Sequence, residues 1–299
     1  MTEFFQHLVN GLSVGAIYAL IALGYTMVYG VLKLINFAHG DVFMVGAMMG
    51  FYVARWTGES AQPTLLGALA VTVASMVVCG LLGFFIERAA YRPLRTAPRI
   101  NSLITAIGVS FLLEYGGQLL FGPDPRAFRV LPPRETIHFV GLHIGFVDVV
   151  TLVVSLGLMF ALQRIVFHTR IGTAMRAVSW NPEVASLMGV NIDFVISFTF
   201  VLGSMLASVA GILYASKYPR VEPLMGLMPG LKAFVAAVLG GIGNVPGAML
   251  GGLLLGLAEQ LVAGYGTSSW RDAVAFSILI VILIAKPSGL LGSATAEKV

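Results

Sequence analysis

Several polar or ionisable side chains stand inside otherwise apolar stretches of this chain. Asn36, His39 and Asp41 interrupt one such run together, Glu114 lies within another, and Asn244 follows the glycines of a later one. Ionisable groups are costly in hydrocarbon, so they mark candidate sites of solute or ion passage. We predict that these residues line a translocation pathway. In the alternative, Asp41 caps a restarting helix, His39 satisfies a backbone group and Glu114 makes a structural hydrogen bond.

Lys232 and Glu259 are two further charges in apolar stretches, and their spacing suggests that they meet. Two spans should form an antiparallel hairpin around Val245-Pro246, and both residues are equally far along the chain from that turn. At about 1.5 Å of rise per residue, both lie roughly 20 Å from the turn. We predict a buried, structural ion pair between them.

A polar insertion at residues 168–191 separates two apolar stretches and is predicted to form two short amphipathic helices. Asn181 is a strong N-cap, Pro182 suits the first helical position and Glu183 favours the positive helix end. Gly189 suits the left-handed position that ends a helix. The insertion therefore has local structure of its own.

The second of these helices carries an apolar patch. Val184, Leu187 and Met188 recur at helical spacing, and Arg176 and Glu183 are nearby charges. One interpretation is a linker that lies on the lipid headgroups. The other is docking to a partner protein, with Leu187 and Met188 as anchors.

The composition identifies an integral membrane protein. The chain of 299 residues is 58% hydrophobic and 11% charged, with a mean hydropathy of +0.90, whereas soluble domains carry roughly 25% charged residues. We predict an all-α, polytopic bundle of eight or nine transmembrane helices, because spanning segments must satisfy their backbone polar groups internally. One domain covers residues 1–299. The expected spans are 8–31, 38–55, 64–86, 100–121, 146–167, 193–216, 228–243, 247–265 and 270–286, of which the second is the weakest.

Basic residues set the expected orientation. Residues 87–99 carry four arginines against one glutamate, the 168–191 insertion is also basic, and the tail holds Lys286 and Lys298. With nine spans these segments share one side, which the positive-inside rule makes the cytoplasm. The N-terminus is then outside and the C-terminus inside. The arginines of the 122–145 loop, among them Arg134, count against this assignment.

Several kinds of chemistry are not expected. Cys79 is the sole cysteine, and the histidines show no ligand spacing, so neither a disulfide nor a metal site is predicted. The sequence holds no Gly-x4-Gly-Lys-Ser/Thr motif with which to cradle a triphosphate. The modest positive charge is spread through short loops, which does not indicate a nucleic-acid partner. We expect no covalent chemistry and no cofactor bound by this chain.

Four motifs together resemble those of a known family. The first lies in the insertion and consists of Arg176-Ala177, Glu183-Val-Ala185 and the closing Gly189. The others are Asn36-Phe-Ala-His-Gly-Asp-Val-Phe-Met-Val-Gly-Ala47, Gly240-Gly-Ile-Gly-Asn-Val-Pro-Gly-Ala-Met-Leu-Gly-Gly252 and Lys286-Pro-Ser-Gly-Leu-Leu-Gly292. In this order they resemble the permeases of ABC importers for branched-chain amino acids, and most closely the shorter, H-type subunit of the high-affinity (Liv) system.

The resemblance implies a transport subunit of the bacterial inner membrane that is not itself an enzyme. Its implied partners are a second related permease, two cytoplasmic ATP-binding subunits that use ATP and Mg, and a periplasmic solute-binding protein, in contact with membrane lipid. The insertion would be the coupling segment to the ATPase, through Arg176, Ala177, Glu183, Ala185, Leu187, Met188 and Gly189.

Two alternatives remain open at this point. Members of the same family carry urea, short amides or other small acids in place of branched-chain amino acids. A different class, an ion-coupled secondary carrier or channel, would use Glu114, Glu259 and His39 as an ion route. The sequence does not decide between a heterodimer and a homodimer of permeases.

Overall fold

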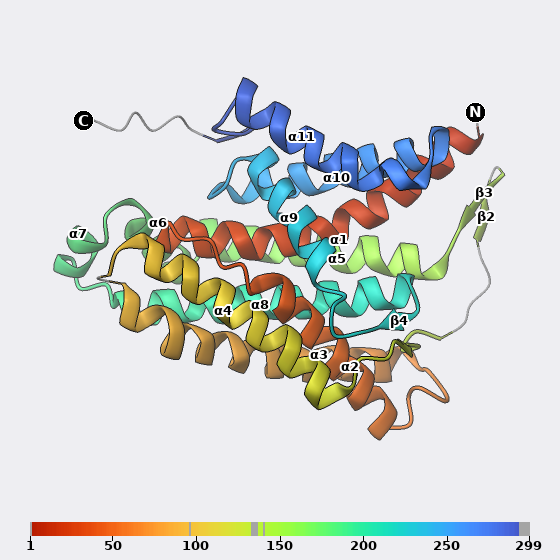
Figure 1. Ribbon diagram of the computed structural model, residues 1–299, viewed down its shortest axis with the longest axis horizontal. Coiled ribbons are helices and arrows are strands. Elements are labelled where there is room, and N and C mark those ends of the chain that lie inside the picture. Colours follow the sequence, from red (N-terminus) through yellow and green to blue (C-terminus); the bar gives the residue numbers. More distant parts are fainter. Residues whose placement is uncertain (1, 96, 133–136, 140, 293–299) are drawn as a thin grey trace.

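The computed structural model describes residues 2–95, 97–132, 137–139 and 141–292, which form a bundle of long helices with short strands in its loops (Figure 1). Arg134 and Lys298 lie outside the described residues. In chain order the elements are α1 (Thr2–Leu32), α2 (His39–Trp56), α3 (Leu65–Ile86), η1 (Glu87–Tyr91), η2 (Arg92–Leu94), α4 (Arg99–Phe121), β1 (Arg126–Ala127), β2 (Ile137–Phe139), β3 (Leu142–Ile144), α5 (Phe146–His168), α6 (Arg170–Trp180), α7 (Pro182–Leu187), α8 (Ile192–Lys217), β4 (Arg220–Val221), α9 (Leu227–Gly240), α10 (Val245–Tyr265), η3 (Ser268–Trp270) and α11 (Arg271–Ala285).

Seven helical segments in the described part of the chain are long and apolar enough to cross a membrane: α1, α3 continued by η1 and η2, α4, α5, α8, α10, and η3 continued by α11. α2 is long enough but less apolar, and α9 has 14 residues, which rise about 21 Å against a hydrocarbon core of about 30 Å. A count of eight or nine spans therefore stays a prediction. The strands, which we did not expect, pair antiparallel as β1 with β4 and β2 with β3, and so tie loops together.

The three basic segments lie at the same end of the bundle. In Figure 1, α6 and α7 lie at one end, and the N-terminus and the β2–β3 hairpin lie at the other. The turn after α3 reaches this end of α8, because Arg92 forms an ion pair with Asp193 and Arg95 bridges Asp193 and the fully buried Glu87. The segment after α11 also folds back here, where Leu291 N donates to Gly240 O over 3.0 Å.

Glycines let α1 run through the middle of the bundle in close contact with α10. A Cβ on Gly15 would lie 2.9 Å from the carbonyl oxygen of Gly252, and one on Gly256 would overlap the backbone of Gly15. Hydrocarbon offers little hydrophobic drive between helices, so close backbone approach supplies much of the packing energy. The small-x3-small pairs Gly11/Gly15 and Gly252/Gly256 thus form the contact between α1 and α10.

α2 and α9 begin inside the bundle, and their first turns meet there. The imidazole of His39 fills the space beside Gly24 of α1, which lies about 12 Å inward from the α1 end at Leu32. A Cβ on Gly40 would lie 2.9 Å from Gly226 O and 3.1 Å from Gly230 Cα, so only glycine permits this approach. The chain therefore turns inward after α1 before α2 starts.

Lys232 and Glu259 are in contact as a buried ion pair between α9 and α10. The Lys232 ammonium also lies 2.7 Å from the carboxylate of Asp272 at the start of α11, whose side chain is half exposed. One lysine therefore joins three helices. The distance of both residues from the turn predicted the contact between Lys232 and Glu259. The contact with Asp272 was not predicted, because Asp272 belongs to the helix after this hairpin.

The α1–α10 contact predicts different responses of two glycines to the same substitution. Gly256→Ala should lower the free energy of unfolding by about 1–3 kcal/mol, because the added methyl must push the two backbones apart. Gly108→Ala on α4 meets nothing within 4 Å and should leave stability unchanged or raise it by about 0.5–1 kcal/mol. Thermal unfolding in detergent checks both, and equal midpoints would contradict the packing role of Gly256.

The Lys232–Glu259 contact predicts non-additive substitutions. Lys232→Met should destabilise by about 3–5 kcal/mol, because it leaves a carboxylate buried without its partner. Lys232→Met combined with Glu259→Leu should recover most of that loss. Arg220→Ala, at the more exposed Arg220–Glu222 pair, is the control and should cost less than about 1 kcal/mol. Additive losses in denaturant titrations would show that the pair is not coupled.

Candidate functional site

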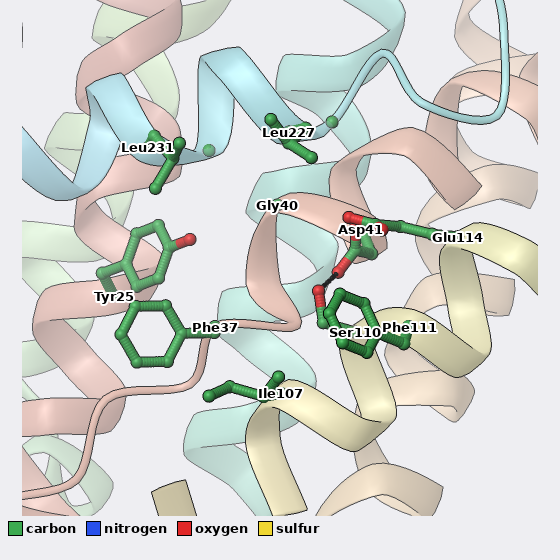
Figure 2. Close-up of a pocket in the computed structure, with 12 residues that line it drawn as sticks. Tyr25, Phe37, Gly40, Asp41, Ile107, Ser110, Phe111, Glu114, Leu227 and Leu231 are labelled. Atoms are coloured by element: carbon green, nitrogen blue, oxygen red, sulfur yellow. Dashed lines mark hydrogen bonds between the residues drawn. The ribbon is translucent and has the colours of Figure 1, made fainter. Parts of the chain in front are cut away.

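A cavity of about 280 Å³ lies where the first turns of α2 and α9 face α4 (Figure 2). Four separate parts of the chain build it, and in the membrane-embedded region such a site must be assembled from facing helices. Its lining residues are Tyr25 of α1, Phe37 before α2, Gly40 and Asp41 of α2, Ile107, Ser110, Phe111 and Glu114 of α4, Gly226 before α9, and Leu227, Gly230 and Leu231 of α9.

Two carboxyl groups, from Asp41 and Glu114, lie side by side at one end of the cavity (Figure 2). Both residues are buried, with 3% and 5% of their surface exposed. The Ser110 hydroxyl donates a hydrogen bond to Asp41 Oδ2 over 2.5 Å. Among the described residues no lysine, arginine or histidine forms an ion pair with either carboxyl group.

The remaining walls of the cavity are apolar. Ile107 and Phe111 project from successive turns of α4, and Leu227 and Leu231 face them from α9 (Figure 2). Residues spaced three or four apart lie on one face of a helix, which explains why each helix contributes a pair. The cavity therefore joins an acidic end to an aliphatic and aromatic wall.

The other residues expected in the pathway are placed differently. The Asn36 side chain accepts a hydrogen bond from the Tyr91 hydroxyl over 3.0 Å, and His39 packs its ring 4.9 Å from that of Tyr25. Both are buried beside the cavity and do not line it. Asn244 lies at the end of the bundle, where its side chain caps α10 and donates to Leu291 O over 2.7 Å.

The 168–191 insertion consists of two capped helices, α6 and α7. The Thr169 hydroxyl accepts from Gly172 N over 3.1 Å at the start of α6, and the Asn181 side chain accepts from Val184 N over 3.1 Å at the start of α7. Gly189 ends α7 with φ of 83°, in the left-handed region that favours glycine. The insertion therefore adopts a defined conformation at the bundle end.

Two hydrogen bonds attach α6 to its neighbours. Ser179 Oγ donates to Gly30 O near the end of α1 over 2.6 Å. The Arg176 guanidinium donates to Val166 O at the end of α5 and lies 5.7 Å from the Phe167 ring centroid. Met175 and Val178 are buried. α6 is thus held against both membrane helices, and Arg176 is exposed but tethered.

Four large apolar side chains of the insertion are exposed: Trp180, Val184, Leu187 and Met188. We call these four residues the docking patch. Trp180, Leu187 and Met188 are 90%, 87% and 80% exposed, and Val184 is also exposed. Contiguous exposed apolar side chains mark sites where a partner or a membrane binds. Trp180 was not expected in this patch. Its exposure depends on how α6 packs against α1 and α5, which the sequence does not show.

The other insertion residues that we singled out lie apart from this patch or beside it. Ala185 is buried, and Ala177 is partly buried on α6. Glu183 is exposed in the first turn of α7. Glu183 is therefore an exposed acidic residue next to Val184 of the docking patch in the sequence.

Comparisons with known proteins place the chain in a family. Residues 7–283 match the profile of the family described as "Branched-chain amino acid transport system / permease component". The chain is 42% identical to the high-affinity branched-chain amino acid transport system permease protein BraD of Pseudomonas aeruginosa, over 99% of this chain and 98% of that protein. It is 41% identical to the permease protein LivH of the same kind of system in Escherichia coli strain K12, over the same shares.

Among solved structures, the chain is similar to PsaBC from Streptococcus pneumoniae in complex with Fab, at 14% identity and a TM-score of 0.47, over 96% of this chain and 91% of that chain. The match to the family profile and the two relatives cover nearly the whole sequence. The chain, a multi-pass membrane protein, therefore belongs to the family of branched-chain amino acid transport system permease components.

Proposed function

We propose that this chain is the transmembrane permease subunit of an ATP-driven importer for branched-chain or related hydrophobic amino acids. The observation that carries the proposal is the docking patch, which a lipid-embedded chain of this family presents at one end of its bundle. A large exposed tryptophan beside leucine and methionine is typical of the centre of a protein–protein interface. In that function a separate subunit must bind ATP, because the sequence of this chain has no phosphate-binding loop.

The insertion is suited to transmit a mechanical signal. The caps of α6 and α7 make each helix a rigid unit, and the hydrogen bond from Ser179 to Gly30 ties α6 to the end of α1. The chain after α1 turns inward at residues 33–38, where Phe37 lines the cavity. Movement of an ATPase against the docking patch would therefore reach the cavity through α6 and the end of α1.

The arrangement of charges supports an orientation with the docking patch in the cytoplasm. The basic segments around Arg92, Arg176 and Lys286 share this end of the bundle, and the positive-inside rule places such segments in the cytoplasm. The N-terminus is then periplasmic and the C-terminus cytoplasmic, in the inner membrane of a bacterial cell. α2 and α9 complete nine transmembrane segments, of which these two start within the membrane.

The complete importer would contain a second, related permease, two cytoplasmic ATP-binding subunits and a periplasmic solute-binding protein. ATP and Mg would be used by the ATP-binding subunits, and this chain would hold no cofactor and perform no covalent chemistry. In this arrangement Asp41 and Glu114 line the pathway, Asn36 and His39 support its wall, and Asn244 caps the turn between α9 and α10.

An ion-coupled secondary carrier is the second candidate function, and the buried Asp41 and Glu114 carboxyl groups favour it. Such groups serve as proton or ion sites in carriers of that class. That function leaves the docking patch unused, which is the reason that the importer is preferred.

Reconstitution into liposomes separates these two functions. The complete importer, supplied with ATP inside and loaded binding protein outside, should accumulate leucine, whereas this chain alone under a proton gradient should not. The expectation follows from energy supply, since the importer draws its energy from ATP hydrolysis by a partner and not from a proton gradient. Leucine accumulation by the chain alone would establish the secondary carrier and overturn the importer.

Substitutions in the docking patch test its role. Trp180→Asp and Leu187→Asp should each weaken binding of the ATP-binding subunit by about 30-fold or more, the loss expected from a hot-spot residue at an interface. Both residues lie outside the packed bundle, so the thermal midpoint of the purified permease should not change. Co-purification and titration with the labelled ATP-binding subunit measure the effect.

Leu187→Met is the matched control, because it keeps an apolar side chain of similar volume, and it should retain binding within about twofold. Undiminished binding by both aspartate variants would mean that the ATPase docks elsewhere on this chain.

A further inference from the structure

We propose, building on the amino-acid importer function above, that the cavity between α2, α4 and α9 is a substrate subsite of this chain. In this subsite the Asp41 and Glu114 carboxyl groups bind the ammonium group of an amino acid, and the wall of Ile107, Phe111 and Leu231 contacts its aliphatic side chain. The ligand class is a small zwitterion with an apolar side chain.

The two carboxyl groups of the cavity have no partner of opposite charge among the described residues. Other buried charges of the described chain have partners of opposite sign, as Glu87 has Arg95 and Glu259 has Lys232. Asp41 and Glu114 are equally buried, yet no basic side chain in the described ranges pairs with either. A buried carboxylate without a cation is costly, so this pair has a place for a cation that the chain does not supply.

The free acceptor capacity of the pair suits an ammonium group. A carboxylate offers about four acceptor sites, and an ammonium group donates three hydrogen bonds. Asp41 receives one hydrogen bond from Ser110 and shares one with Glu114, which leaves most acceptor sites of the two carboxyl groups free. One ammonium group can therefore donate to both carboxyl groups at once.

The size and the wall of the cavity select the rest of the ligand. A volume of about 280 Å³ is close to the lower limit of small-molecule sites, which begin near 300 Å³. It suits a single amino acid better than a peptide. Leu227 and Leu231 of α9 face Ile107 and Phe111 of α4 across the cavity, and burial of a branched aliphatic side chain between them is favourable at about 25 cal/mol per Å².

The start of α9 favours the carboxylate end of the same ligand. α9 begins beside the cavity at Gly226 and Leu227, and its first turn holds no acidic residue. The N-terminus of a helix carries partial positive charge, and interrupted membrane helices place it toward anionic groups of transported solutes. The cavity is thus negative at Asp41 and Glu114 and positive at the start of α9.

Transport by the complete importer gives the first test. Asp41→Asn combined with Glu114→Gln should lower kcat/KM for leucine uptake by about tenfold or more, because the neutral pair loses its attraction for the ammonium group. Asp124→Asn, which removes an exposed carboxyl group in a loop, is the matched control and should transport as the wild type does. Assembly with the ATP-binding subunits should be the same in all three proteins.

Chemical labelling gives a test that does not depend on transport. A cysteine introduced by Ile107→Cys, in a Cys79→Ala background, should react with a cationic methanethiosulfonate about tenfold faster than with an anionic one, because of the adjacent carboxyl groups. Leu231→Cys on the opposite wall is a second reporter. Asp41→Asn with Glu114→Gln should bring the ratio of rates close to one, and Asp124→Asn should not change it.

Two fragments of leucine identify which group the carboxyl pair recognises. Isoamylamine keeps the ammonium group and should protect the introduced cysteine, whereas 4-methylpentanoate keeps only the carboxylate and should not. Equal protection by both, or a ratio of rates that the neutral pair leaves unchanged, would overturn the subsite. If the wild-type importer fails to take up branched-chain amino acids while the labelling results hold, the proposed function fails and the ammonium site remains.

Discussion

The close approach of α2 and α9 at three glycines is the contact on which the centre of this protein depends. Gly40, Gly226 and Gly230 bring the first turns of two helices together inside the bundle, where any larger side chain would separate them. In hydrocarbon, irregular backbone is tolerated only where protein surrounds it or where it lines a cavity. Here both conditions hold, because α1 and α4 enclose the junction and the cavity lies beside it.

This junction also explains how an event at the bundle end could reach the centre. α6 is bonded to the end of α1 at Gly30, and the segment that follows α1 runs inward to the start of α2. The other interrupted helix, α9, returns from the junction to the same bundle end, where the segment after α11 packs against its last turn. α2 and α9, two of the helices that border the cavity, are therefore connected to the end that carries the docking patch.

Among the residues that the structure describes, the buried charges and their partners fall into two groups with different physical roles. Lys232 pairs with Glu259 and Asp272 and so joins α9, α10 and α11, as Arg95 joins Glu87 to Asp193. Such groups fix the positions of helices, since each loses its partner if a helix moves away. The carboxyl groups beside the cavity hold no two helices together through an opposite charge, and this difference is what sets them apart as a site for a ligand.

The sequence by itself determined the features that depend on neighbouring residues along the chain. Hydropathy located the helices, because each must bury its own backbone in lipid, and the caps at Asn181 and Gly189 are set by local side-chain and backbone preferences. Distance from a turn placed Lys232 and Glu259 at one depth, and helical spacing indicated that Leu187 and Met188 share a face.

Only the tertiary structure decided which faces of separate helices meet. Hydropathy specifies the depth of a residue but not the direction in which its helix is turned, so Asp41 and Glu114 reach the cavity while Asn36 and His39 pack beside it. The same reason applies to Ser110, Asp272 and Trp180, which sequence reasoning did not single out. Their surroundings come from helices far apart in the chain, and packing between those helices fixes them.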